Sequence, residues 1–306
     1  MHNGLRMKQH NLSDAQISAI SSVNAHLFTQ ALSINGITDD VIKQFQETIY
    51  NYYRLFRRDF AWRQTTNPYH IVVSEIMLQQ TQTSRVQGKY ENFITQFPDF
   101  ATLASAQMRD LLAAWQGLGY NRRALALQKI AQRVMHEFDG KLPDDPEILQ
   151  TFSGIGPNTA GSICAFAFNC PITFIETNIR SIFIHFFFQG QTEVHDKMLL
   201  PLVAKTVDRH NAREWYYALM DYGVALKKMY PNPSRKSVHH ATQSKFEGSD
   251  RQIRGAILRL LTKHVLITEQ DLLCAFPSDE QRVIDIAHDL AKDGFIRLEK
   301  GHVSLK

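Results

Sequence analysis

Residues 151–160 read TFSGIGPNTA, and residues 174–178 read FIETN. The Gly154-Ile155-Gly156 turn opens a helix, and its glycines leave backbone N–H groups accessible to an anion. The start of that helix adds about half a positive charge at the same place. Downstream, the carboxylate of Glu176 follows an apolar run. A phosphate-binding turn close in sequence to a positioned carboxylate indicates chemistry on a nucleic acid.

The composition permits a nucleic-acid partner without requiring one. The chain has 306 residues, a formal net charge of +4 and 44% hydrophobic residues, which is enough for a large core. Its three cysteines, Cys164, Cys170 and Cys274, have no paired spacing. This indicates reduced thiols rather than a disulfide framework or a metal site.

No segment is predicted to cross a membrane. Residues 1–30 lack the apolar core and cleavage motif of a secretory signal. The longest apolar stretch, 163–175, is too short to span a bilayer. We therefore expect a cytoplasmic, nucleoid-associated protein with no membrane partner.

Apolar residues recur at three- and four-residue spacings through most of the chain, which predicts a mostly α fold made of short helices. Glycine and proline mark the joints between them. The predicted helices of the body cover 40–60, 69–97, 105–117, 122–138, 145–152 and 159–167.

The composition changes after Tyr230, where a polar, proline-interrupted stretch without periodicity predicts a linker. Beyond it, three helical patterns precede an alternating stretch with a Lys-Gly turn, as in a β-hairpin. Three helices and a terminal hairpin indicate a small winged-helix-like α+β module. The predicted regions are a helical extension at 1–39, a main domain at 40–230, the linker at 231–249 and the winged-helix-like module at 250–306.

Four sequence blocks are more specific than any periodicity. They are Trp62-Arg63 with NPY at 67–69 and SEIMLQQTQT at 74–83, WQGLGY at 115–120, FSGIGPNTAG at 152–161, and MDYG at 220–223. In this order they resemble the helix-hairpin-helix (HhH-GPD) DNA glycosylase superfamily, in particular adenine DNA glycosylases of the MutY type. The resemblance implies a two-lobed helical glycosylase fold, followed here by the winged-helix-like module.

Glu75 lies among apolar residues, so its carboxyl group is either paired with a base or kept protonated by burial. A buried ion pair is the purely structural alternative. The resemblance implies that Glu75 is the general acid that protonates the departing base. Its pKa is then expected to be raised, so that a proton is available at neutral pH.

Glu176 stands where the family carries Asp. The resemblance implies that this carboxylate stabilises the oxocarbenium-like sugar, or bonds to it transiently, while water attacks. Asn178 matches a family Asn that orients the carboxylate or the water. The extra methylene of Glu moves the carboxylate, which can alter the rate. A helix-capping acid is the structural alternative.

Asn158 bears on the type of reaction. In relatives that resemble endonuclease III, a Lys at this hairpin position attacks the sugar and forms a Schiff base. Asn has no nucleophilic amine, which excludes a lyase step through this residue. The resemblance therefore implies a monofunctional glycosylase in which Asn158 supplies a polar contact at the catalytic site.

The resemblance also implies a set of DNA contacts. Gln79, Gln80 and Tyr120 match family positions that wedge into the duplex where the base is extruded. Ordinary helix surface and a buried tyrosine are the structural alternatives. The implied hairpin contacts are Gly154, Ile155, Gly156 and Thr159.

The family usually carries four cysteines after the fourth block, and these hold a [4Fe–4S] cluster. Residues 227–236 read KKMYPNPSRK and contain no cysteine, so no cluster and no metal site are expected. A monovalent cation at the hairpin is compatible with the resemblance. Basic residues dominate the segment 227–263, which predicts a phosphate-contacting surface that includes Arg251 and Arg254. A solvated helix face is the alternative.

These observations favour a monomeric glycosylase that binds duplex DNA with a mismatch or lesion and hydrolyses an N-glycosidic bond. The expected base is adenine opposite 8-oxoguanine or guanine. MutY-type enzymes usually end in a nudix-like domain that recognises 8-oxoguanine, and the winged-helix-like module stands in its place. Thymine or uracil opposite guanine is therefore an alternative substrate. A catalytically weak protein that binds lesions is a second alternative.

Overall fold

The computed structural model describes residues 18, 26–32, 34, 36–242, 244–277 and 279–306. The chain divides into two compact units. Unit 1 consists of residues up to 58 and 170–240, and unit 2 consists of 59–169 and 241–306. The predicted extension at 1–39 lies largely outside the described residues, and the bounds of the four predicted regions remain predictions.

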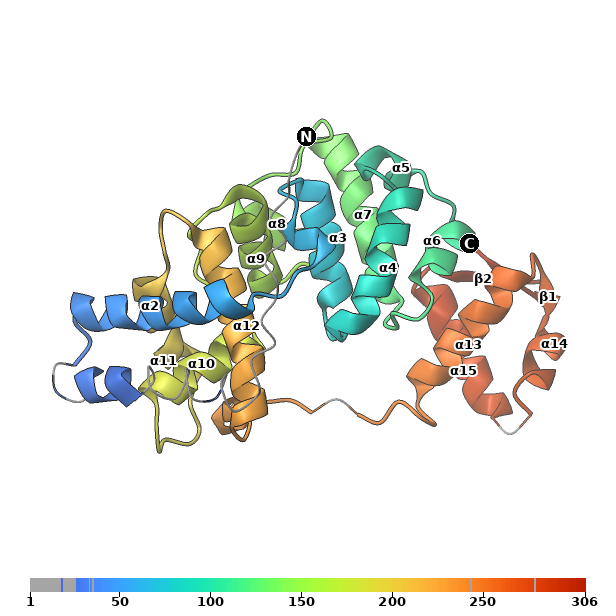
Figure 1. Ribbon diagram of the computed structural model, residues 1–306. Coiled ribbons are helices and arrows are strands. Elements are labelled where there is room, and N and C mark those ends of the chain that lie inside the picture. The colour runs from blue at the N-terminus through green and yellow to red at the C-terminus, as the bar shows by residue number, and fades with distance from the viewer. Residues whose placement is uncertain (1–17, 19–25, 33, 35, 243, 278) are drawn as a thin grey trace, which may run out of the picture. The chain divides into compact units, whose positions relative to one another are not determined.

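Unit 1 is helical and has an aromatic core. Phe45 packs edge-on against Phe183, Phe186 and Trp215, with ring centroids 5.3–5.9 Å apart. The aromatic run that begins at Phe183 therefore serves packing. The elements are α2 (Asp39–Phe56), α10 (Thr177–Phe187), α11 (Asp196–Thr206), α12 (Ala212–Met229) and the 3-10 helix η2 (Pro233–Lys236) (Figure 1).

The start of the predicted linker is packed rather than extended. Next to η2, the Val194 backbone N–H donates to Lys236 O (2.9 Å), and Val238 N–H donates back to Val194 O (3.3 Å). The Asn232 side-chain oxygen accepts from Ser181 Oγ (3.3 Å) and from the Ser234 backbone N–H (3.1 Å). Hydrogen bonds rather than apolar side chains hold this segment in place. Apolar periodicity therefore does not predict its structure.

The first part of unit 2 contains short helices joined by tight turns. They are η1 (Ala61–Arg63), α3 (Pro68–Leu78), α4 (Thr83–Gln96), α5 (Phe100–Ala104), α6 (Met108–Trp115), α7 (Arg122–Glu137), α8 (Pro146–Gln150) and α9 (Pro157–Phe168). The single helix predicted at 69–97 is wrong, because the chain breaks between α3 and α4 at Gln80, whose φ is +53°. Within the described part of the chain, no helix is both long and apolar enough to span a bilayer.

The C-terminal part of unit 2 has the predicted three helices and hairpin. In the hairpin turn, Lys300 and Gly301 have φ of +49° and +74°, as a two-residue turn of type I′ requires. A third strand, β1 (Ile267–Thr268), is too short to be predicted. It pairs antiparallel with β3 (His302–Leu305), so β3 lies between β1 and β2 (Ile296–Glu299). The elements are α13 (Asp250–Lys263), β1 (Ile267–Thr268), α14 (Glu269–Cys274), α15 (Glu280–Lys292), β2 (Ile296–Glu299) and β3 (His302–Leu305).

Candidate functional site

The hairpin lies between α8 and α9 in unit 2. Gly154 has a φ of +76°, and a Cβ there would lie only 2.9 Å from Ala126 Cβ on α7. Ile155 is buried beneath the turn, whereas Gly154 and Gly156 are exposed. Gly156 caps α9, and Pro157 occupies its first turn, where a missing N–H costs nothing. The turn therefore presents backbone to solvent at a helix N-terminus, as an anion site requires.

Glu75 lies on α3 and is half-buried. Its Oε2 is 2.5 Å from the Oγ of Ser162, a buried residue of α9. The same Oγ lies 3.0 Å from the Thr159 carbonyl oxygen in the first turn of α9. The Glu75 carboxyl group is therefore hydrogen-bonded to α9, the helix that begins at the hairpin.

The contacts of Ser162 allow both protonation states of Glu75. A hydroxyl group has one proton and can accept other hydrogen bonds. When Glu75 is ionised, Ser162 can donate to it; when Glu75 is protonated, Ser162 can accept from Glu75 and donate to Thr159 O. This arrangement suits a group that gives up and regains a proton. Ser162 was not predicted, because nothing in its local sequence marks it.

The end of α3 is bound to the hairpin by Gln79. Its Nε2 donates to Gly154 O and to Thr159 Oγ1, each at 3.1 Å. Three of the predicted DNA-contacting residues therefore lie together in unit 2. Gln80 is exposed, and Tyr120 is half-buried in the left-handed conformation with φ of +46°.

Arg123 joins the two segments that carry the predicted wedge residues, and the sequence did not reveal it. Its buried guanidinium donates to Ile76 O (2.9 Å) and Met77 O (2.8 Å) at the end of α3. It also donates to Leu118 O (3.1 Å) and Gly119 O (3.0 Å), just before Tyr120. Burial lowers the pKa of Arg123 to about 10. These hydrogen bonds stabilise the chain where α3 ends.

Glu176 is the N-cap of α10 in unit 1. Its Oε1 accepts from the backbone N–H groups of Asn178 (2.7 Å) and Ile179 (2.9 Å). Its Oε2 accepts from Asn178 Nδ2 at 3.0 Å. The structural alternative, a helix-capping acid, thus describes what this carboxylate does locally. Three donors also hold an anion in one place, as the implied catalytic role requires.

Lys227 on α12 completes this group. Its ammonium donates to Asn178 Oδ1 at 2.8 Å. Because an ammonium can only donate, the Asn178 oxygen must face Lys227, and its NH₂ group must face Glu176. Burial lowers the pKa of Lys227, against the opposing effect of the Glu176 carboxylate and together with that of Arg180. Lys227 was counted only as part of the basic surface in the sequence.

Gly223 of the fourth block permits this contact between α10 and α12. A Cβ there would lie 2.6 Å from Asn178 Cβ and 2.8 Å from Asn178 O. We expect Gly223→Ala to lower the free energy of unfolding by about 1–3 kcal/mol, because the two helices must separate. Urea denaturation measures the change. The matched control is Gly88→Ala on α4, where a Cβ meets nothing within 4 Å; equal midpoints for the two variants would contradict the prediction.

The remaining predicted site residues have the following places. Asn158 is exposed in the first turn of α9. Arg254 forms an ion pair with Asp293 (2.5 Å), and Arg251 donates to the Tyr120 hydroxyl group. Both arginines therefore have partners within unit 2. Their predicted phosphate contacts remain a prediction.

The residues at hand do not fit the cluster that the family usually holds. A [4Fe–4S] cluster needs cysteine thiolates. Cys164 is buried on α9, Cys170 follows that helix, and Cys274 is exposed on α14. Among the described residues, no three His, Cys, Asp or Glu side chains gather in a way that could hold a metal ion.

Comparison with known proteins supports the resemblance. Residues 73–210 match the model of the HhH-GPD superfamily base excision DNA repair proteins. They form an HhH-GPD domain. The chain is similar to the adenine DNA glycosylase of Buchnera aphidicola subsp. Baizongia pistaciae, with 34% identity over 194 residues, or 62% of this chain and 54% of that protein. It is also similar to that of Mycolicibacterium smegmatis, with 29% identity over 270 residues, or 80% and 90%.

Solved structures agree with the HhH-GPD fold. A thermostable thymine-DNA glycosylase matches with a TM-score of 0.55 and 25% identity, covering 60% of this chain and 85% of that one. A non-covalent endonuclease III–DNA complex matches with a TM-score of 0.51 and 14% identity over the same shares, which shows the fold alone. The predicted superfamily and the mostly α-helical fold are confirmed. The Buchnera match spans about half of its relative's length.

Proposed function

We propose that the protein is a monofunctional DNA glycosylase that excises adenine opposite 8-oxoguanine or guanine and acts as a monomer. The observation that carries the proposal is the Glu75 carboxyl group, 2.5 Å from Ser162 on the helix that follows the hairpin. A proton donor fixed to a phosphate-binding helix suits a reaction on DNA. The similarity to adenine DNA glycosylases supports adenine as the base.

In the proposed reaction, Glu75 gives its proton to the base as the N-glycosidic bond breaks. The base departs with both electrons of that bond, and the sugar becomes an oxocarbenium-like cation. The Glu176 carboxylate stabilises this cation. Water then adds to the sugar carbon and loses a proton, which restores the acid form of Glu75.

Other residues orient the Glu176 carboxylate and limit the reaction to removal of the base. Lys227 and Asn178 fix the Glu176 carboxylate through the hydrogen bonds described above. Asn158 has no amine to form a Schiff base with the sugar, so the product is an intact strand with an abasic site. Gln80 and Tyr120 fill the space that the extruded base leaves.

The proposed enzyme uses no iron–sulfur cluster, and a monovalent cation at the hairpin is compatible with it. Lysine and arginine side chains of the segment 227–263 contact phosphates in place of a cluster loop. Duplex DNA with a mismatch is the partner, and the cytoplasmic nucleoid is the expected location.

The test is incubation with duplexes that carry A opposite 8-oxoguanine, A opposite G, T opposite G or U opposite G, followed by alkali. Strand cleavage at adenine is expected. Cleavage only at thymine would favour the alternative to which the structural similarity to a thymine-DNA glycosylase points. Tight binding without cleavage of any duplex would overturn the enzymatic proposal in favour of a lesion-binding protein.

A further inference from the structure

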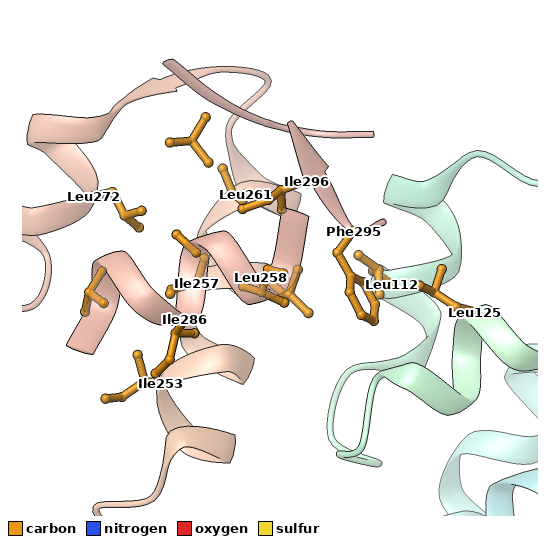
Figure 2. Close-up of a cluster of buried hydrophobic side chains, with 14 residues drawn as sticks. Leu112, Leu125, Ile253, Ile257, Leu258, Leu261, Leu272, Ile286, Phe295 and Ile296 are labelled. Carbon is orange, nitrogen blue, oxygen red and sulfur yellow. The ribbon is translucent and has the colours of Figure 1, made fainter. Parts of the chain in front are cut away.

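The C-terminal module shares its hydrophobic core with the helices before the hairpin. Leu112 on α6 and Leu125 on α7 are 3% and 8% exposed and belong to the same buried cluster as Ile257, Leu258 and Phe295. Figure 2 shows Phe295 beside Leu112 and Leu125. Separating the module from α6 and α7 would expose these apolar side chains to water, so their burial keeps the module in place.

Polar contacts surround this shared core. Arg109 on α6 donates to Thr262 O (2.6 Å) and His264 O (3.1 Å) at the C-terminal end of α13, where unpaired carbonyl groups attract a cation. Asp293, which ends α15, accepts from Arg122 on α7 (2.9 Å). The module is therefore hydrogen-bonded to α6 at the end of α13 and to α7 at the end of α15.

Arg251, in the first turn of α13, extends the contact to Tyr120. Its guanidinium donates to the Tyr120 hydroxyl group and lies 5.2 Å from the ring centroid. It is held in turn by Ser244 O at 2.7 Å. A second guanidinium, that of Arg123, lies 5.6 Å from the same ring centroid.

Tyr120 needs such support because of its backbone. A φ of +46° is uncommon for residues other than glycine and is disfavoured for a large side chain. The segment keeps this conformation because Arg123 holds the two preceding carbonyls and Arg251 holds the hydroxyl group. A ring fixed at both ends loses less entropy when it enters a duplex.

We propose that Arg251 is a positioning residue that holds Tyr120 ready to fill the space of the extruded base, which makes the C-terminal module part of lesion recognition. The inference rests on the proposed function. It assigns Arg251 a role through Tyr120 in place of a direct phosphate contact. The ligand of this surface is duplex DNA at an unstacked base pair.

The test is a double-mutant cycle of Arg251→Met and Tyr120→Phe in the full-length protein. The readouts are single-turnover excision and the fluorescence of 2-aminopurine at the target position, which reports unstacking. Each single variant is expected to lose about tenfold in excision rate and in unstacking, and the double variant to lose no more than either. Arg251→Lys, which keeps a donor for the hydroxyl group, is expected to recover part of the loss.

Other outcomes overturn the inference. Independent, multiplicative losses in the cycle would show that Arg251 does not act through Tyr120. A weaker affinity with a salt slope reduced by about one would show a phosphate contact instead. Arg297→Met, on the exposed face of β2, is the matched control and should behave as the wild type. If the wild type excises nothing, the proposed function fails, whereas the unstacking signal still tests Arg251.

Discussion

Glu75→Gln is expected to slow base excision by about 10²–10⁴-fold, the range that a positioned general acid contributes. Glutamine has nearly the same shape and keeps an oxygen and an NH₂ group for the contact with Ser162 Oγ, which is 2.5 Å from the native carboxylate. Its amide protons are not acidic enough to be transferred to a departing base. Single-turnover excision with enzyme in excess measures this step without product release.

The control separates chemistry from folding and binding. Glu91→Gln makes the same substitution at an exposed position on α4 and should excise at the wild-type rate. DNA affinity of Glu75→Gln should stay within a few-fold of the wild type, because Glu75 is not predicted to contact the duplex backbone. Turnover retained by Glu75→Gln would show that another group supplies the proton.

The parts of the fold that could be predicted are those that local sequence determines. Gly154 marks the hairpin because only glycine tolerates its φ of +76° and its close approach to Ala126. The Lys300-Gly301 turn between alternating residues predicts the terminal hairpin for the same reason. Helical periodicity predicts most helices of unit 2, with ends displaced by a few residues, but only α2 among the helices α2, α10, α11 and α12 of unit 1.

What could not be predicted depends on contacts between distant residues. Ser162 lies 87 positions after Glu75, and Lys227 lies 49 positions after Asn178. Arg123 lies 47 positions after Ile76, whose carbonyl it binds, so no window of sequence shows the break that it stabilises. A serine in an apolar helix or one arginine of a pair has no periodic signal, and only the fold gives it a partner.

Glu176 shows why a structural and a functional interpretation of one residue need not exclude each other. The N-cap bonds that satisfy α10 are the same bonds that hold an anion at one position. Aspartate is the stronger N-cap residue and is what the family carries here, so capping alone does not explain a glutamate. The added methylene instead sets how far the carboxylate reaches from the helix.

Glu176→Gln is expected to reduce excision by about 10²–10³-fold, the range for losing one preorganised group that stabilises charge in the transition state. The amide oxygen can still accept from the backbone N–H groups of Asn178 and Ile179, so most of the cap is kept. The negative charge that would stabilise the sugar cation is lost. Single-turnover rates and urea denaturation together measure the two effects.

Glu176→Asp distinguishes charge from position. Aspartate keeps the charge and caps α10 at least as well, so the free energy of unfolding should not fall. The carboxylate, however, moves back by roughly 1 Å, and a shift of that size can cost on the order of 10²-fold in rate. We therefore expect a stable but slow variant, because Asn178 and Lys227 hold the carboxylate at the reach of glutamate. Faster excision by Glu176→Asp would show instead that the site still favours the family's aspartate and that the longer side chain limits the enzyme.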